Sequence, residues 1–472
     1  MTTQVLTPES SWKDAKRYLW LLSPMLPVIG LVMISVAYLF GISSLYWGMP
    51  VLFYGIFPLL DRMIGDDRSN APESVVAALE QDNYYRAIVY SYLPGQYLAT
   101  IVGAWLAVTA GLATWEMLGL IVSVGMVNGV GINTAHELGH KKESLDRWLA
   151  KLTLAPVAYG HFFVEHNKGH HKNVATPEDP ASSKMGETFW AFLPRTMIGS
   201  VRSAWNIEKA RLERKGEPVL STQNENLQAW AMTVAFFGGL TLWLGIAALP
   251  FLLVQAFYGA ALLEVVNYIE HYGLLRQFDE KTGRYERCKP EHSWNNNNIV
   301  TNLVLYQLQR HSDHHANPTR SFQALRHFDE SPQLPAGYAA MILVAYIPWL
   351  WFRQMDHRVA AHYKGDLSKA NLYGPKRDKL IKKWSNAQFD DGRPELFPAE
   401  KAGSQVNTSD ASCYQCTDCG YIYNEAAGCE HEGFAPGTPW SAIPDDWACP
   451  DCAVREKLDF KPVVPDKPAK AA

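Results

Sequence analysis

Residues 118–140 read Leu-Gly-Leu-Ile-Val-Ser-Val-Gly-Met-Val-Asn-Gly-Val-Gly-Ile-Asn-Thr-Ala-His-Glu-Leu-Gly-His, and this stretch decides the fold class. The run carries no charged side chain before Glu137, and about 20 such residues are enough to cross a bilayer as a helix. It ends in His136 and His140, whose spacing of four places both imidazoles on one face of a helix. The sequence therefore predicts a membrane-spanning helix over 116–136 that runs into a pair of metal-binding side chains.

Six apolar stretches are long enough to span a membrane. They cover residues 18–40, 43–62, 86–110, 116–136, 227–246 and 249–271. They pair into three hairpins whose turns contain no Lys or Arg, whereas the other connections are rich in both. Because basic connections favour the cytoplasmic side, we expect both termini and the candidate ligands His136 and His271 on that side. The sequence thus predicts an all-α integral membrane protein with six transmembrane helices, followed by a small polar domain. The net charge of −4 gives no reason to expect nucleic acid as a partner.

Nine of the 15 histidines fall in four short clusters. The clusters are His136-Glu-Leu-Gly-His140, His166-Asn-Lys-Gly-His170-His171, Asn267-Tyr-Ile-Glu-His271 and His311-Ser-Asp-His314-His315. Spacings of three and four residues direct imidazoles to one side of a helix, so each cluster can present its nitrogens to one point. Neutral imidazole is a common ligand of iron, zinc and copper. Nine nitrogen ligands exceed what one ion can take, which predicts two metal ions held mainly by histidine.

The first cluster also matches a different kind of site. His136-Glu137-x-x-His140 is the zinc metalloprotease motif, in which the glutamate is the general base. A catalytic zinc needs only one further protein ligand, which would leave six histidines without a function. We therefore favour the two-metal site over a membrane-embedded protease.

Several polar residues next to the clusters could orient the ligands. Glu137, Glu165, Glu270 and Asp313 each adjoin a candidate ligand and could accept its second N–H. Glu264 lies inside the sixth apolar stretch, where an ionisable side chain is costly and usually functional, and Asn267 lies one turn before His271. We expect Glu137, Glu264 and Asn267 to support the site, with Glu264 as an orienting group or a proton relay. His161 could support it too, and the remaining five histidines are expected to be ordinary hydrogen-bonded residues.

The C-terminal region carries a second metal-binding pattern. Cys416-Thr-Asp-Cys419 and Cys449-Pro-Asp-Cys452 are two C-x-x-C pairs, and four thiolates at this spacing suit zinc or iron. The surrounding motifs are Tyr-x-Cys-x-x-Cys-Gly-Tyr-x-Tyr, Ala-Pro-Gly-Thr-Pro-Trp and Pro-Asp-Asp-Trp-x-Cys-Pro-x-Cys. Over residues 412–461 they resemble rubredoxin, which implies one iron held by the four cysteines and an electron carrier rather than a zinc ribbon. Cys288, Cys413 and Cys429 are read as free thiols.

The pattern divides the chain into two domains joined by a linker. Residues 1–398 form the membrane domain, in which 338–351 is expected to be an interfacial helix and 355–398 a cytoplasmic cap. Residues 399–411 have the composition of a linker, and 412–472 form the rubredoxin domain.

The four histidine clusters together resemble those of the bacterial membrane-bound alkane 1-monooxygenases, within the desaturase–hydroxylase superfamily. The resemblance covers roughly residues 15–390, and its most diagnostic part is the stretch from Leu308 to Pro318, continuing through Arg320 and Phe322. It implies a non-haem di-iron centre that uses O2 to convert medium-chain n-alkanes to 1-alkanols in the bacterial inner membrane. Rubredoxin is the electron donor of that family, and its fusion to this chain points to the same function.

The resemblance also implies partners and leaves alternatives open. The rubredoxin iron would be re-reduced by a separate NAD(P)H-dependent flavoprotein reductase, because no G-x-G-x-x-G nucleotide-binding motif is apparent in the chain. The main alternative is a related di-iron hydroxylase, epoxidase or desaturase that acts on fatty acids or alkylaromatics. A membrane anchor for rubredoxin, without catalysis, would leave the histidine clusters unexplained.

Overall fold

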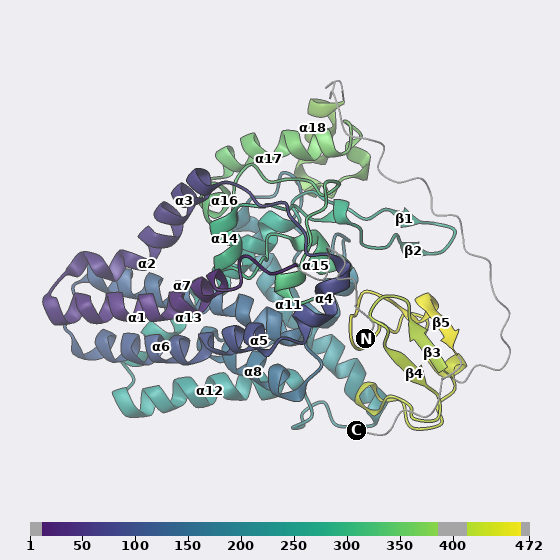
Figure 1. Ribbon diagram of the computed structural model, residues 1–472, viewed down its shortest axis with the longest axis horizontal. Coiled ribbons are helices and arrows are strands. Elements are labelled where there is room, and N and C mark those ends of the chain that lie inside the picture. The colour runs from purple at the N-terminus through teal and green to yellow at the C-terminus, as the bar shows by residue number, and fades with distance from the viewer. Residues whose placement is uncertain (1–11, 386–412, 464–472) are drawn as a thin grey trace, which may run out of the picture.

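The computed structural model describes residues 12–385 and 413–463, so the predicted linker 399–411 lies outside the described residues. The longer helices are α1 (Leu22–Phe40), α6 (Tyr92–Thr109), α7 (Thr114–Gly139), α8 (Ser144–Leu154), α11 (Phe189–Lys215), α12 (Glu225–Leu244), α13 (Ala248–Glu270) and α17 (Pro348–His362). The shorter helices are α2 (Gly48–Val51), α3 (Phe57–Ile64), α4 (Glu73–Glu80), α5 (Asn83–Tyr90), α9 (Phe162–Val164), α10 (His171–Asn173), α14 (Ile299–Val304), α15 (His311–Ala316), α16 (Tyr338–Ala345) and α18 (Arg377–Trp384). The long apolar helices lie side by side at one end of the molecule, and the small C-terminal domain lies at the other (Figure 1).

Five helical segments of the described chain are long and apolar enough to cross a membrane. They are Leu19–Phe40, Ser43–Ile64, Thr114–Gly139, Glu225–Leu244 and Ala248–Glu270. The predicted third span, 86–110, is not among the five, so the expected number of six is not confirmed. This stretch is broken at Ser91 between α5 and α6, where Pro94 has no N–H to donate to the carbonyl of Tyr90. Arg86 on α5 is bound to Asp146 and belongs to the polar side of the molecule. The remaining helix α6 carries the polar Gln96 and packs against α1 and α7.

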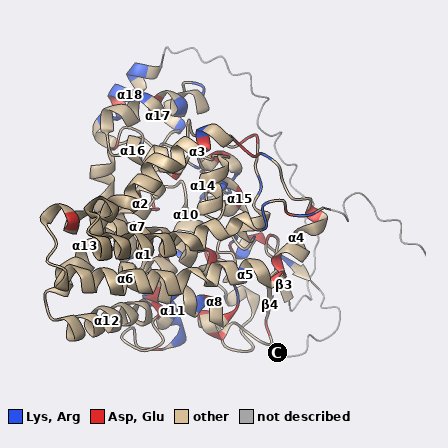
Figure 2. Cartoon of the chain, turned by 60° about the vertical axis from the view of Figure 1, so that its left-hand side comes forward, with Lys and Arg blue, Asp and Glu red and all other residues tan. Residues whose placement is uncertain are grey.

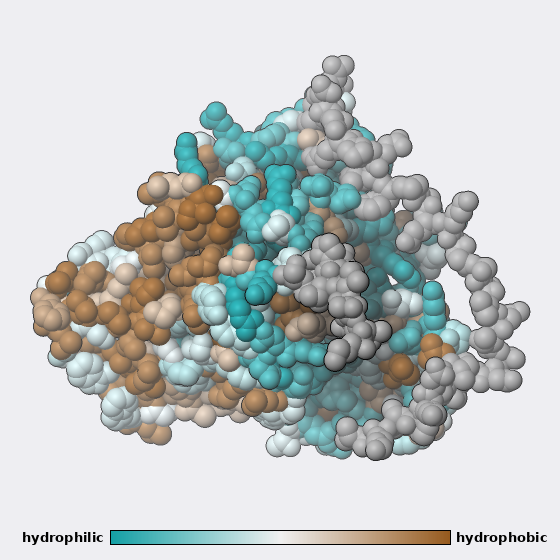
Figure 3. Space-filling model, in the orientation of Figure 1, coloured by the Kyte–Doolittle hydropathy of each residue, from teal (hydrophilic) through white to brown (hydrophobic). Residues whose placement is uncertain are grey.

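The outer surface of this helical bundle is apolar. Large hydrophobic side chains are exposed along the spans, among them Val32, Phe40, Val234, Leu242, Trp243 and Phe257. The hydrophobic colour gathers over the end formed by the long helices, and the hydrophilic colour covers the opposite side (Figure 3). Lys, Arg, Asp and Glu are correspondingly sparse along α1, α6 and α7 (Figure 2). Exposed apolar surface of this extent is typical of helices that face lipid.

Glycines bring α7 and α13 into direct backbone contact. A Cβ at Gly125 would lie 2.6 Å from the carbonyl oxygen of Gln255, and one at Gly129 would lie 2.9 Å from that of Gly259. Small residues four apart are a common way for membrane helices to approach closely, because their association depends on packing rather than on the hydrophobic effect. The contact fixes the two helices that end in His136 and His271.

A polar half lies beyond the histidine-bearing ends of α7 and α13. It includes α8, the far end of α11, and α14 to α18, with a two-stranded hairpin of β1 (Phe278–Asp279) and β2 (Arg284–Tyr285). The stretch 338–351, expected as one interfacial helix, is interrupted before Pro348 and divides between α16 and α17. One side of it is buried: Tyr338 and Trp351 are fully enclosed, and Trp351 packs on Tyr268 of α13 with ring centroids 4.9 Å apart. Leu343, Ile347 and Trp349 are exposed.

The C-terminal domain is a three-stranded antiparallel sheet in the order β4-β3-β5. The strands are β3 (Cys413–Cys416), β4 (Ile422–Asn424) and β5 (Phe460–Val463). Tyr423, Trp447 and Phe460 form an aromatic core beside the cysteines. The mostly helical architecture and the small rubredoxin-like sheet are therefore confirmed.

Gly125→Ala tests the α7–α13 contact. The added methyl group would collide with a backbone oxygen that cannot move aside, and overpacking of this kind costs about 1–3 kcal/mol. Thermal unfolding in detergent should show a clear loss of stability. Gly239→Ala is the control, because nothing lies within 4 Å of its Cβ position, and that variant should be as stable as the parent or more so. Equal stability of both variants would contradict the close packing.

Candidate metal centres

The four histidine clusters converge at the polar ends of the spanning helices. His136 and His140 lie at the end of α7, and His271 directly follows α13. The fourth cluster lies on α15 (His311–Ala316). The second cluster lies on a π-helical turn, Glu165–His170, that runs into α10. A π turn is wider than an α turn and is frequent at functional sites.

The nine histidines form two separate groups. His136, His140, His166, His171 and His314 make one, and His170, His271, His311 and His315 make the other. Within each group the ligand atoms all lie within 4.8 Å of one another, and every member is buried. We call them the five-histidine site and the four-histidine site. The second and fourth sequence clusters each contribute histidines to both sites. The short spacing within these clusters had suggested that each binds a single ion.

The π turn explains how the second cluster divides. It brings the Nε2 atoms of His166 and His171, five residues apart, to 3.1 Å from each other. His170 then points to the other group, where its ring lies 5.0 Å from that of His271. Periodicity read from the sequence would have paired His166 with His170, because an α-helix places residues four apart on one face.

The spacing of the nitrogens fits metal ligation. Nitrogens that bind one ion at about 2.1 Å and roughly at right angles lie about 3 Å apart. In the five-histidine site His314 Nε2 lies 2.8 Å from His136 Nε2 and 3.0 Å from His171 Nε2. In the four-histidine site His311 Nε2 lies 3.2 Å from His271 Nε2 and 2.9 Å from His315 Nε2. The Nε2 atoms of His140 and His170 are buried without a hydrogen-bond partner, as expected of atoms directed at an ion.

Burial keeps the ligands in the form that binds metal. It lowers the pKa of His171 and of His315 far below the ordinary value, and neighbouring imidazoles lower both further. These side chains are therefore neutral and offer a lone pair. A set of neutral nitrogens suits iron, zinc or copper rather than magnesium or calcium, which prefer oxygen.

Three groups support the four-histidine site. Asp179 Oδ2 lies 2.9 Å from His170 Nδ1 and orients that ring, and it is buried in a polar turn with Ser182. Glu270 Oε2 lies 3.2 Å from His311 Nε2, so its carboxylate reaches the site itself. The carbonyl of His292 lies 3.4 Å from His271 Nδ1. Sequence reasoning missed Asp179 and His292, because both lie on irregular segments without periodicity; an acidic residue in the turn just after the second cluster was the available signal.

The other predicted supporting residues lie elsewhere. Glu137 binds Lys141 at 2.7 Å and accepts the N–H of Phe322, rather than bonding to an imidazole. Asp313 holds Arg326 and so anchors the loop that follows α15. Glu165 is buried, and its Oε1 atom lacks a hydrogen-bond partner. His161 is buried against Tyr159, with ring centroids 4.4 Å apart.

Glu264 is embedded in the bundle and fully hydrogen-bonded. It accepts hydrogen bonds from the Tyr159 hydroxyl at 2.5 Å, the Thr196 hydroxyl at 2.8 Å and the Asn267 amide at 3.3 Å. The predicted residues Glu264 and Asn267 thus bond to each other, in one buried cluster that ties α13 to α11. Three donors offset the cost of placing this carboxyl group away from water.

The four cysteines fit a tetrahedral ion. Sulfurs at about 2.3 Å from one ion lie about 3.8 Å apart. Cys416 Sγ lies 3.8 Å from Cys452 Sγ, and Cys419 Sγ lies 3.6 Å from Cys449 Sγ. Cys288, Cys413 and Cys429 form no disulfide in the structure.

The cysteine domain contacts the polar half through ion pairs that all have the same direction of charge. The membrane domain supplies the cations and the cysteine domain the carboxylates. The pairs are Lys142–Asp451, Lys168–Glu432, Lys172–Glu456, Arg214–Glu432, Arg284–Glu456 and Arg287–Asp459. Burial opposes ionisation of Glu432, but Lys168, His431 and Arg214 together lower the pKa of its carboxyl group to about 2.

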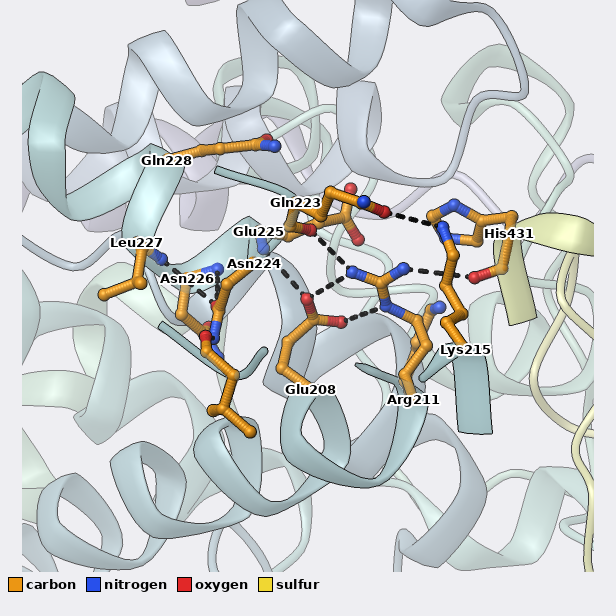
Figure 4. A network of polar contacts seen from close by, with 12 residues as sticks. Glu208, Arg211, Lys215, Gln223, Asn224, Glu225, Asn226, Leu227, Gln228 and His431 are labelled. Atoms are coloured by element: carbon orange, nitrogen blue, oxygen red, sulfur yellow. Dashed lines mark hydrogen bonds and ion pairs between the residues drawn. The ribbon is translucent and has the colours of Figure 1, made fainter. Parts of the chain in front are cut away.

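A buried polar network on α11 also belongs to the interface with the cysteine domain. Arg211 is bound to Glu208 by two 2.7 Å hydrogen bonds and donates a third, at 3.1 Å, to the carbonyl of His431 (Figure 4). Gly433 lies against the same helix: a Cβ there would be 2.8 Å from the Arg214 carbonyl carbon, and its φ of +89° favours glycine. The cysteine domain therefore docks with a defined fit.

Comparison with known proteins agrees with this architecture. Residues 113–345 match the fatty acid desaturase family, and residues 413–460 match rubredoxin. The alkane 1-monooxygenase of Acinetobacter baylyi is 52% identical over 375 residues, which cover 79% of this chain and 91% of that protein. The chain belongs to the alkane 1-monooxygenase family. The alkane 1-monooxygenase of Pseudomonas putida is 48% identical over 393 residues, 83% of this chain and 97% of that protein.

Family membership confirms the enzyme class expected from the sequence, an alkane 1-monooxygenase that carries a rubredoxin domain. A more distant relative is named for different substrates: the hydroxylase component of the xylene/toluene monooxygenase of Pseudomonas putida is 29% identical over 265 residues, which cover 54% of this chain and 70% of that protein.

Metal analysis of two histidine variants tests the division into two sites. His136→Ala removes a ligand of the five-histidine site, and His315→Ala one of the four-histidine site. With one ion in each site, each variant should bind one iron fewer per chain and the double variant two fewer, with the visible absorption of the rubredoxin site unchanged. If either single variant lost both histidine-bound irons, the two groups would not be independent sites.

Proposed function

We propose that this enzyme hydroxylates the terminal carbon of medium-chain n-alkanes with O2 at a di-iron centre of nine histidines, using electrons from its own rubredoxin domain. The observation that carries the proposal is the position of the two histidine sites, between the ends of apolar spanning helices and a docked tetrathiolate domain. The nitrogen spacing supports one iron in each site, and the sulfur spacing supports a third iron in the rubredoxin domain.

The role of the protein is to hold neutral ligands in a dry, fixed arrangement. Iron would supply the activation of O2, which no side chain can perform alone on an unactivated C–H bond. Asp179 fixes the tautomer and orientation of His170, and burial excludes water that would divert a reactive oxidant. Two electrons and two protons accompany each O2, because one oxygen atom enters the alkane and the other leaves as water.

The apolar substrate suits the position of the site. An alkane dissolves in the bilayer and offers no polar handle, so the enzyme must select it by the shape of an apolar passage. The helices α7 and α13, which carry ligands at their ends, are largely enclosed by other helices along their length. This arrangement favours entry from lipid toward the ligand-bearing ends, where a methyl terminus would arrive first.

The membrane arrangement belongs to the same proposal. α6 would be a sixth span, since it packs between spanning helices although it is shorter and more polar than the other five. The basic residues that hold the rubredoxin domain lie at the ends opposite the uncharged turns. The positive-inside rule supports a proposal in which the metal centres, both termini and the rubredoxin domain are on the cytoplasmic face of the inner membrane.

An alkylaromatic substrate is the second candidate, because one relative is named for xylene and toluene. Incubation of the purified enzyme with NADH, a purified rubredoxin reductase and separate hydrocarbons distinguishes the two. We expect 1-alkanols from alkanes of medium length, with oxygen derived from ¹⁸O2. Faster benzylic hydroxylation of p-xylene, or products oxidised at internal carbons, would contradict the proposed substrate and regiochemistry.

Deletion of residues 412–472 tests the proposed electron supply. The membrane domain has its own core, so the truncated enzyme should remain folded and should lose turnover with reductase and NADH alone. Added free rubredoxin should restore turnover, and only at concentrations approaching the mM effective concentration that a tether provides. If turnover persisted without any rubredoxin, electrons would enter by another route.

A further inference from the structure

The two cysteine loops of the rubredoxin domain have the same C-x-x-C spacing but different surroundings. The loop Cys449–Cys452 faces the membrane domain: Asp451 binds Lys142 at 2.6 Å. Pro450 and Asp451 also line a cavity of about 80 Å³ together with His140 and Asn167. The covered loop therefore lies next to a ligand of the five-histidine site.

The loop Cys416–Cys419 makes no hydrogen bond or ion pair to the described residues of the membrane domain. Among residues 12–385 and 413–463, the hydrogen bonds and ion pairs between the domains come from segments 431–432 and 446–459 of the rubredoxin domain, and none from 416–421. Thr417 and Gly420 are exposed. Cys419 is partly exposed, whereas its counterpart Cys452 is only 2% exposed. The tetrathiolate site is therefore accessible to solvent on the side of Cys419 and covered on the side of Cys452.

We propose that the rubredoxin domain stays docked on the membrane domain while it transfers electrons. The reductase binds over the open loop Cys416–Cys419, and each electron leaves through the covered loop Cys449–Cys452. We call this arrangement a through-relay. This inference rests on the proposed function. Each passage moves one electron from the reduced flavin of the reductase to the tetrathiolate site, which then passes it to the five-histidine site. Two such one-electron transfers supply the two electrons that each O2 requires. NADH then reduces the flavin of the reductase again by two electrons.

The chemistry of the open face indicates the kind of partner it fits. Ile422 is 51% exposed beside the open loop. In the sheet, Gln415 pairs with Ile422 on one side and with Lys461 on the other, so this face carries one exposed ammonium group. Asp418 in the open loop is already paired with Arg455 of the same domain at 3.3 Å. The carboxylates that hold the membrane domain, among them Glu432 and Asp451, lie on the covered side. The open face therefore fits a flavoprotein that presents its flavin edge within a rim of apolar and polar side chains, with an acceptor for Lys461.

Two variants separate entry from exit. Stopped-flow bleaching of the ferric rubredoxin site by a purified rubredoxin reductase with NADH measures entry, and reoxidation of that site by the membrane domain measures exit. Ile422→Glu should raise the half-saturating reductase concentration about tenfold, because it places an unpaired charge in the contact. Lys142→Gln, on the covered side, should slow reoxidation and leave the half-saturating concentration unchanged. An unaltered visible spectrum shows that each variant retains its iron site.

Thr417→Glu provides an independent check of the same face and should act like Ile422→Glu. If both variants at the open loop left the half-saturating concentration unchanged, or if Lys142→Gln raised it as much as they do, the assignment of the two loops would be overturned. Binding of the reductase to the zinc-substituted enzyme can be measured without electron transfer. It should be weakened by Ile422→Glu and by Thr417→Glu and left unchanged by Lys142→Gln.

A covalently locked enzyme tests whether undocking is needed. Carbodiimide joins an ammonium and a carboxylate in contact into an amide with loss of water, and Lys168–Glu432 at 2.7 Å and Lys142–Asp451 at 2.6 Å are suitable pairs. The locked enzyme, identified by peptide mass, should be reduced by the reductase as fast as the untreated enzyme. The carbodiimide-treated double variant Lys142→Gln, Lys168→Gln is the matched control for unspecific modification.

The outcomes distinguish this inference from the proposed function. If dithionite but not the reductase reduced the locked enzyme, the domain would have to undock and the through-relay would be wrong. If dithionite-reduced, untreated enzyme failed to hydroxylate any alkane, the proposed function would fail, whichever way the reductase binds.

Discussion

Seven of the nine buried imidazoles have an Nε2 atom 2.8–3.2 Å from that of another. When all nine rings direct lone pairs at the two sites, as metal ligation requires, they repel one another unless cations lie between them. This constraint governs the rest of the molecule. Burial keeps the rings neutral and available, and the surrounding helices must then hold a cluster that is unfavourable without metal. The glycine contact between α7 and α13 provides rigid support, because it fixes the two helices whose ends carry His136 and His271. The membrane bundle is in this sense the scaffold of the metal centre.

The need to hold these ligands in place also explains why polar segments pack against the histidine-bearing helix ends. Ligands at helix ends need orienting partners. Asp179 and the carbonyl of His292 come from short segments packed beyond the spanning helices, and Glu270 is the last residue of α13 itself. Those segments also present the lysines and arginines that hold the acidic face of the rubredoxin domain. The electron carrier is thereby seated beside the five-histidine site, with Pro450 and Asp451 facing the same cavity as His140.

Much of this could be predicted from the sequence, because the signals are local. Apolar length predicted five of the candidate spans, short histidine spacings predicted which imidazoles converge, and two C-x-x-C pairs within aromatic motifs predicted the rubredoxin fold. The partition of ligands could not be predicted: a π turn joins His166 to His171 rather than to His170, and periodicity assumes an α-helix. Glu137 shows the same limit, since its neighbour in sequence is a ligand but its bonding partner is Lys141. The start of the third predicted span could not be placed from hydropathy, which does not show that Arg86 is bound to Asp146 in the polar half.

The central claim is that two separate groups of five and four histidines each hold one iron. The most direct test is an anomalous difference map of the iron-loaded enzyme, recorded on both sides of the iron absorption edge. The account predicts one peak among His136, His140, His166, His171 and His314, a second among His170, His271, His311 and His315, and a third among the four cysteines. A single peak shared by the nine histidines, or peaks that appear at the zinc edge instead, would contradict it.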